Sequence, residues 1–144
     1  METQDERRDA TREARLAELA RMPVAHHLGY RVLERSADEA VLAQPARPEY
    51  AQVEGVVHGG LLGTLADTAA VYVLYPELPE GTGLTSIEFK LNFLRPALLG
   101  RGELRARARL VQRGRTVSLC DVEVEQGDRL VAKGLFTYAT VQRG

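Results

Sequence analysis

The amino-acid sequence predicts an α+β fold in which an antiparallel sheet of about five to six strands wraps around one long central helix, with an extra N-terminal helix. Two observations lead to this prediction. Residues 58–75 are apolar on nearly all sides of a helical pattern, which is typical of a buried helix. The second half of the chain alternates apolar and polar residues with a period of two, which indicates strands with one face in solvent. A sheet that curls around the helix buries the apolar surfaces of both.

Length and composition limit the possible domain organisation. The 144 residues suffice for one domain with a real core. We therefore expect a charged N-terminal extension at 1–21 and a single domain at 22–144. Nineteen basic and twenty acidic residues give a formal net charge of −1, which argues against a nucleic-acid-binding protein.

The sequence also predicts a cytoplasmic protein without a bound metal. The first 21 residues are charged and show no secretory signal, and no segment approaches the roughly 20 apolar residues that cross a bilayer. The lone Cys120 cannot form an intrachain disulfide, which fits a reducing compartment. His26, His27 and His58 are the only imidazoles, and the first two would point in opposite directions in an extended segment.

The first elements along the chain are a helix and a hairpin. Strong helix formers with few apolar residues predict a charged surface helix at 5–21, which ends near Pro23. Two weakly alternating segments, 30–35 and 40–44, are separated by a short polar stretch and predict the hairpin.

The central helix follows an irregular segment that begins at Pro45. The apolar pattern starts at His58 and continues to about Tyr75, and Pro76 and Pro79 then end the helix.

Four strands are predicted in the remainder, at 86–93, 103–110, 116–125 and 130–141. The apolar face of the first of these strands is expected to consist of Ile87, Phe89, Leu91 and Phe93. On the second strand, Arg105, Arg107 and Arg109 share a face that we interpret as a solvent-exposed surface.

The first candidate functional group lies at the start of the central helix. Gly59 and Gly60 lower helix propensity there, so a factor other than helix stability favours them. Without side chains, they let a ligand approach the free backbone N–H groups of the first turn, which can hold a carbonyl oxygen as it gains negative charge. The structural alternative is equally open, because glycines near helix starts are common.

Asp67 is the second candidate. It is placed mid-helix among Leu65, Ala66, Ala69 and Ala70, where a charge loses hydration. A buried carboxylate tends to be paired, hydrogen-bonded or functional. The alternative is a structural Asp bonded to Thr64 or Thr68.

Helix geometry links Gly59 with Asp67 through a second subunit. The eight residues between them correspond to about 12 Å along a helix. A donor and a nucleophile that serve one carbonyl must both lie about 3 Å from it, so one helix cannot supply both. Two antiparallel helices across a twofold axis can, which predicts a homodimer with two equal sites.

The motif His58-Gly59-Gly60 with Asp67 nine residues after the histidine resembles the PaaI-type (phenylacetate-pathway) branch of the hotdog-fold thioesterases. The segment 85–97, TSIEFKLNFLRPA, shares this resemblance, which extends from about residue 22 to 141. It implies a hotdog fold, a homotetramer built from dimers, and acyl-CoA substrates hydrolysed without a metal or organic cofactor.

The resemblance also implies roles for individual residues. Asp67 takes the position of the catalytic carboxylate, and the Gly59 amide that of the donor to the carbonyl. His58 takes a positional role at the helix start. Gln52 stands where such families have an Asn or Gln near the thioester, although this branch more often has Asn. Ser86 stands where related enzymes hold water with a hydroxyl, and the adjacent Thr85 is the alternative.

Further residues are candidates for binding the substrate. Residues at the helix and its neighbours are expected to line an apolar acyl tunnel, with core packing as the alternative for each: Leu61, Leu62, Leu65, Tyr72 and Phe93. Gly60 leaves room at the tunnel mouth. Arg113 and Arg115 flank a glycine turn and are candidates for the CoA phosphates, although a solvated turn also explains them. Cys120 is placed like a strand core residue and is discounted as a nucleophile.

We therefore expect hydrolysis of acyl-CoA, aryl or medium to long chain, to a carboxylic acid and CoA. Asp67 would either activate water or attack the carbonyl to give a mixed anhydride. Two alternatives stay open on the same fold. A non-catalytic acyl-CoA sensor would need no carboxylate opposite the Gly59 donor. An enoyl-CoA hydratase would use an Asp with a His at the carbon chain.

Overall fold

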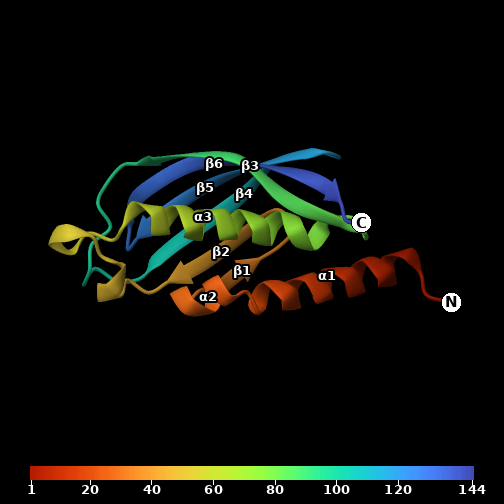
Figure 1. Ribbon diagram of the computed structural model, residues 1–144, viewed down its shortest axis with the longest axis horizontal. Helices are drawn as coiled ribbons and strands as arrows, with labels where there is room; N and C mark the ends of the chain where they lie inside the picture. Colours follow the sequence, from red (N-terminus) through yellow and green to blue (C-terminus); the bar gives the residue numbers. More distant parts are fainter.

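The computed structural model describes residues 1–144 and confirms the predicted architecture. Six antiparallel strands form one sheet in the order β1-β2-β4-β5-β6-β3, and the helix α3 (Gly59–Leu74) lies along its concave face (Figure 1). The strands are β1 (Arg31–Arg35), β2 (Glu39–Gln44), β3 (Thr82–Phe93), β4 (Leu104–Arg113), β5 (Val117–Gln126) and β6 (Arg129–Gln142). The remaining helices are α1 (Gln4–Ala20) and α2 (Pro23–Leu28), with short 3-10 turns at Pro48–Tyr50, Val53–Gly55 and Tyr75–Glu77.

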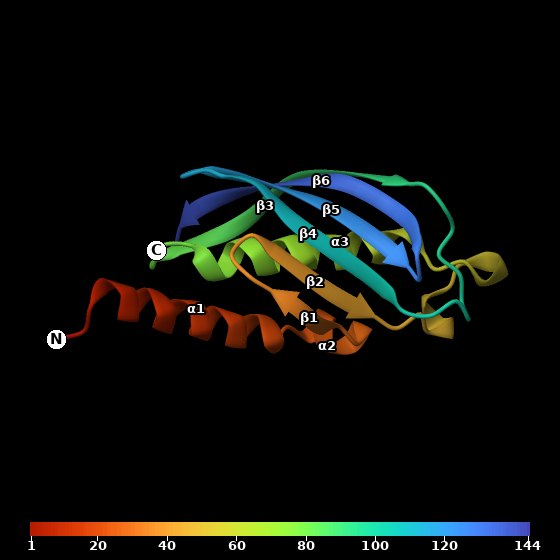
Figure 2. The same cartoon turned by 180° about the vertical axis from the view of Figure 1, so that it is seen from behind.

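The central helix is covered by the middle of the sheet. It packs mainly on β4 and its neighbours β2 and β5, which lie side by side when the molecule is seen from behind (Figure 2). The strand residues beneath it include Ala40, Ala106 and Ala108, all fully buried. Because these side chains are small, the helix can approach the sheet closely, and its own Leu65 and Val73 complete the core.

The edge strand β3 departs from the simple alternation expected from the sequence. Its register to β6 shifts between Ser86 and Glu88, which leaves Ile87 without a partner in the ladder. Phe89 then pairs with Phe136, and the two rings stack with centroids 4.8 Å apart. The bulge therefore interrupts the predicted alternation at Ile87, and the side chains of Ile87, Phe89 and Phe93 are all about half exposed, at 53%, 49% and 58%.

The arginines of β4 lie on the outer face of the sheet, as predicted. Each is close to a carboxylate: Arg107 and Arg109 to Glu39 on the neighbouring strand β2, and Arg105 to Glu103, which directly precedes β4. These exposed ion pairs contribute little to stability. They do keep this face polar.

The N-terminal helix is attached to the domain by a buried guanidinium. The side chain of Arg15 is only 6% exposed and donates hydrogen bonds to the backbone carbonyls of Tyr75, Leu78, Pro79 and Thr82. These carbonyls belong to the segment that leaves α3 and enters β3, and those of Tyr75 and Pro79 also accept backbone hydrogen bonds from Leu78 and Thr82 within the segment. Arg15 therefore holds α1 against the end of the central helix.

A second polar contact between α1 and the domain is centred on Glu77. Its carboxylate accepts hydrogen bonds from Arg12 at 2.9 and 3.0 Å and lies 2.9 Å from the guanidinium of Arg35 on β1. Burial of the Glu77 carboxyl raises its pKa, but the hydrogen bonds and charges of the two arginines outweigh this effect and hold the pKa below its ordinary value.

A short helix not predicted from the sequence follows α1. Pro23, expected only to end the first helix, occupies the first turn of α2, a position that proline favours. His26 and His27 therefore lie in a helix and not in the extended segment that was expected. Gly29 ends α2 with a φ of +72°. None of the helices combines the length and hydrophobicity that crossing a membrane requires.

Replacing Glu77 with Gln should lower the free energy of unfolding by about 1–3 kcal/mol at pH 7, because hydrogen bonds to a charged group are lost. A carboxylate whose folded pKa is lowered stabilises the protein above its unfolded pKa of about 4.3, and this contribution disappears as the pH falls through the folded pKa. The difference between Glu77→Gln and wild type should therefore shrink below about pH 4. Urea unfolding at pH 7 and pH 3.5 measures it.

Glu80→Gln is the matched control, since Glu80 is exposed three residues further along the same segment and forms no ion pair. An equal loss of stability in Glu77→Gln at both pH values would contradict the assignment.

Candidate active site

The first turn of α3 leaves one backbone donor free. The Nδ1 atom of His58 accepts a hydrogen bond from the Gly60 N–H at 3.0 Å, and the His58 carbonyl accepts one from Leu61 at 3.0 Å. The N–H of Gly59 donates no hydrogen bond within the chain. The amide predicted to polarise a carbonyl is thus the free one, and the structure gives His58 a capping position.

Both glycines at the helix start also have a steric explanation. A Cβ atom on Gly59 would lie 3.1 Å from the ring of Phe93, and one on Gly60 would lie 3.1 Å from Nδ1 of His58. The alternative that these glycines serve packing at the helix start is therefore supported by two close contacts. Phe93 covers the helix start, and its own side chain remains 58% exposed.

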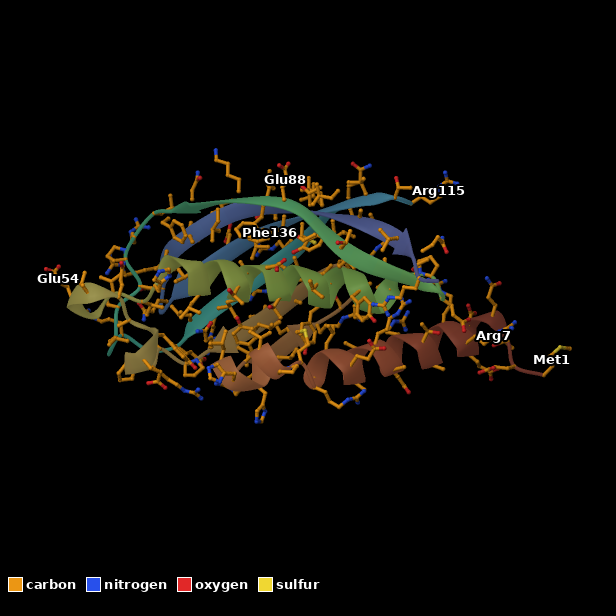
Figure 3. The ribbon with its side chains drawn as sticks, in the orientation of Figure 1. Met1, Arg7, Glu54, Glu88, Arg115 and Phe136 are labelled. Carbon is orange, nitrogen blue, oxygen red and sulfur yellow. The ribbon has the colours of Figure 1, made fainter.

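The loop that carries Gln52 folds back towards the same end of the helix. The N–H of His58 donates to the carbonyl of Tyr50 at 2.9 Å, and the N–H of Gln52 donates to Val56 at 2.8 Å. The turn between them uses positive φ angles at Glu54 and Gly55. Figure 3 shows Glu54 at the tip of this loop, at the end of the molecule where α3 begins. The side chain of Gln52 is exposed there.

Asp67 has a hydrogen-bond partner that the sequence did not reveal. Its Oδ1 atom accepts a hydrogen bond from the hydroxyl of Tyr138 on β6 at 2.5 Å, whereas Oδ2 accepts none within the chain. The hydroxyls of Thr64 and Thr68 donate to backbone carbonyls of the helix, so the structural alternative that paired them with Asp67 was wrong. Asp67 is half-buried, with one oxygen held and the other available.

Tyr138 is suited to hold that carboxylate at all ordinary pH values. Its side chain is buried, and burial together with the negative charge of Asp67 raises the pKa of the phenol. The hydroxyl therefore stays protonated and acts as a donor. Strand alternation places Tyr138 on the inward face with Phe136. The sequence does not show which helix residue that face meets, because this depends on how far the sheet curls.

Asp67 lines a groove of about 300 Å³. Its floor is the helix stripe formed by Asp67, Val71 and Tyr75, which are spaced four residues apart and so lie on one face of α3. The walls come from β3, from β6 with the C-terminal segment, and from the end of α1: Leu84, Ser86, Tyr138, Arg143, Glu18, Leu19 and Met22. A larger hollow of about 500 Å³ lies between α1 and the 3-10 turn after α3. Half of its lining residues are charged, and it contains none of the predicted site residues.

The structure separates the two hydroxyl candidates on β3. Ser86 pairs with Tyr138 and lines the groove beside Asp67, whereas Thr85 pairs with Ala139. Since neighbouring residues of a strand point to opposite faces, Thr85 faces away from the groove. Of the two, only Ser86 is brought to the candidate carboxylate.

Several residues expected in the acyl tunnel lie elsewhere. Leu62, Leu65 and Tyr72 are buried in the core between α3 and the sheet, which is the packing role that the sequence left open for them. Leu61 and Phe93 lie at the Gly59 end of the helix, outside the groove.

The two predicted CoA-binding arginines lie at the opposite end of α3 from Gly59. One guanidinium nitrogen of Arg113 donates to the carbonyls of Ala37 at 2.6 Å and Val73 at 3.4 Å, so this nitrogen is already engaged. Arg115 is exposed at the β4–β5 turn, and Figure 3 shows it far from Glu54. An arginine that the sequence did not indicate, Arg143, lies over the Tyr75 ring at 5.4 Å and borders the groove.

Comparisons with known proteins agree with this architecture. The family described as the thioesterase superfamily matches residues 54–133, more than half of the chain. A thioesterase family protein from Silicibacter pomeroyi is 25% identical, with a TM-score of 0.82 over 94% of this chain and 98% of that chain. The thioesterase HI1161 from Haemophilus influenzae, at 24% identity, shows the same fold with a TM-score of 0.79 over 88% of each chain.

A relative from Halobacterium salinarum, whose name describes it as an esterase, is 38% identical over 73 residues. This match covers 49% of the present chain and 46% of the relative, so it spans about half of that protein's length.

Cys120 should be nearly inert in the folded protein. It is fully buried on β5, and burial raises the pKa of its thiol to about 12. At pH 8 we expect the native protein to react with an aromatic disulfide reagent at least about a hundredfold more slowly than the protein unfolded in guanidinium chloride. Reaction at the unfolded rate under native conditions would show that the thiol is exposed.

Proposed function

We propose an acyl-CoA thioesterase activity for this chain, which belongs to the thioesterase superfamily. Family membership supports thioester hydrolysis in general terms. We further propose that the substrate is an aryl or medium- to long-chain acyl-CoA, that the products are the carboxylic acid and CoA, and that the chain belongs to the PaaI-type branch.

The observation that carries the proposal is the half-buried carboxylate of Asp67, with Oδ1 held by Tyr138 and Oδ2 available beside the groove. A carboxylate in this position can take the proton of a water that attacks the thioester carbonyl, or attack the carbonyl itself. In the first route the C–S bond breaks and the leaving thiolate takes the proton that Asp67 removed from the water. In the second route the C–S bond breaks as the mixed anhydride forms on Asp67, and water then cleaves the anhydride, which releases the carboxylic acid, restores the carboxylate and supplies the proton for the thiolate. The hydroxyl of Ser86, at the same groove, is proposed to hold the water.

The site requires two subunits. Gly59 and Asp67 belong to one uninterrupted helix, about 12 Å apart along its axis, so they cannot meet at one carbonyl within a chain. We propose that two copies of α3 lie antiparallel across a twofold axis, which brings the free Gly59 N–H of one subunit to Asp67 of the other. Two such dimers would form the tetramer, with Gln52 near the thioester and Arg113 and Arg115 near the CoA phosphates.

The two alternative functions receive less support. An enoyl-CoA hydratase would use a histidine for proton exchange, whereas His58 caps α3 by accepting the Gly60 N–H at Nδ1, which supports a positional role. A non-catalytic sensor would not need a carboxylate with a free oxygen beside the groove.

Replacing Asp67 with Asn keeps the shape of the side chain and an acceptor for Tyr138 but removes the base. We expect kcat for acyl-CoA hydrolysis to fall by about 10²–10⁴-fold in Asp67→Asn, the usual scale for loss of an acid–base group. Thiol release from a panel of aryl and straight-chain acyl-CoAs measures it. Asp128→Asn changes an exposed carboxylate in the β5–β6 turn and is the matched control. A folded Asp67→Asn protein with wild-type turnover would end the proposal.

Subunit sharing can be tested by replacing the donor. Gly59→Pro removes the N–H at a position that proline tolerates, whereas Gly59→Ala adds a similar Cβ against Phe93 but keeps the N–H. We expect Gly59→Pro to lose kcat relative to Gly59→Ala by about 10²–10³-fold, the cost of one oxyanion donor.

Mixing unfolded Asp67→Asn and Gly59→Pro subunits and refolding them together should then restore about a quarter of wild-type activity. Half of the random dimers combine one subunit of each kind, and each of these has one intact site of two. Activity that stays at the level of the separate variants would contradict a shared site.

A further inference from the structure

The groove at Asp67 is continuous along one stripe of the central helix. Asp67, Val71 and Tyr75 follow one another at intervals of four residues, so the floor from the carboxylate to Tyr75 is about 12 Å long. Leu84 and Ser86 of β3 form one side. Within one chain, this stripe leads an acyl group attached to a thioester at Asp67 towards Tyr75.

The other side of the groove is made by the N-terminal helix. Leu19, in the last turn of α1, and Met22, just after it, contribute apolar surface, and Glu18 closes the side near Tyr75. These residues precede the segment 54–133 that matches the superfamily. The wall is held in place by the bonds of Arg15 to four backbone carbonyls and by the contacts of Glu77.

The far end of the groove is polar and occupied. The hydroxyl of Tyr75 donates to Glu18 at 2.7 Å, and guanidinium groups of Arg15 and Arg143 lie over the Tyr75 ring at 5.1 and 5.4 Å. A methylene chain that continued past Tyr75 would have to displace these groups or strip water from them, which is unfavourable. The volume of about 300 Å³ is also at the lower limit for ligand pockets.

We propose that α1 is the specificity-determining wall of the acyl site and restricts it to compact acyl groups, a single aromatic ring or a short aliphatic chain. This inference rests on the proposed thioesterase function. It keeps the aryl substrates proposed above and replaces the medium to long acyl chains with short ones. Met22 supplies lateral contact with the acyl group, and the Glu18–Tyr75 pair sets the limit of its length.

The test compares kcat/KM for benzoyl-CoA, hexanoyl-CoA and palmitoyl-CoA. The wild type should prefer the two compact substrates by at least about tenfold, because a few methylenes placed in or out of a pocket change kcat/KM on that scale. Met22→Ala should lower kcat/KM for hexanoyl-CoA about five- to tenfold, mainly through KM, because it removes apolar contact but no reacting group. Glu18→Ala should raise the relative rate with palmitoyl-CoA by a similar factor.

Glu13→Ala is the matched control, since Glu13 lies on α1 in an exposed position and does not line the groove. Hydrolysis with no change of preference in Met22→Ala and Glu18→Ala would overturn the inference and leave the thioesterase function standing.

A binding measurement separates the two proposals. Calorimetric titration with the non-hydrolysable thioethers hexyl-CoA and hexadecyl-CoA does not require catalysis. If the wild type hydrolyses no thioester and Met22→Ala binds hexyl-CoA more weakly than the wild type does, the proposed function is refuted and the assignment of α1 as a wall of the binding groove is supported. Equal binding by wild type and Met22→Ala would refute the assignment of α1 as its wall.

Discussion

The hydrogen bond between the Tyr138 hydroxyl and Asp67 is the interaction on which the candidate site depends. A carboxylate in the middle of an apolar helix loses hydration, and a buried phenol from the sheet replaces part of that hydration without adding a charge. The sheet covers most of α3 and leaves a half-buried stripe that includes Thr64, Asp67 and Val71. Because Asp67 lies on this stripe, its second oxygen stays accessible while the rest of the helix is sealed in the core.

Most of the fold could be predicted because it follows from local patterns. Apolar residues on all sides of 58–75 and alternation in the later strands determine a buried helix and a curled sheet. Asp67 and Gly59 could also be found, since a charge among apolar residues and glycines at a helix start depart from the pattern. Ile87 could not be placed, because a bulge in the ladder shifts its register without a sequence signal. The roles assigned to all the site residues stay predictions, and the structure adds only where these residues lie: Asp67, Gly59, His58, Gln52, Ser86, Arg113 and Arg115.

The remainder of the site could not be predicted because it consists of contacts between distant segments. Tyr138 meets Asp67 across 71 residues, and the pairing depends on sheet curvature. The N-terminal helix was predicted as a charged surface extension because its apolar residues are few. It is instead attached to the domain, with Leu16 and Leu19 packed on the core, Arg15 donating to backbone carbonyls after α3, and Arg12 binding Glu77. Only two leucines mark this face, and its other contacts are made by arginines, so the hydrophobic pattern alone does not distinguish it from a solvated face.

The attachment of α1 by a guanidinium to main-chain oxygens has an evolutionary consequence. Every residue has a carbonyl, so Arg15 makes few demands on the identity of the residues at the end of the central helix. The side chains at the end of the central helix can therefore change while α1 stays attached through Arg15, and the part of the helix that bears Asp67 stays the same. The proposed catalytic carboxylate and the proposed wall of the acyl site would then be encoded by separate segments of the gene, and mutations in one segment would leave the other unchanged.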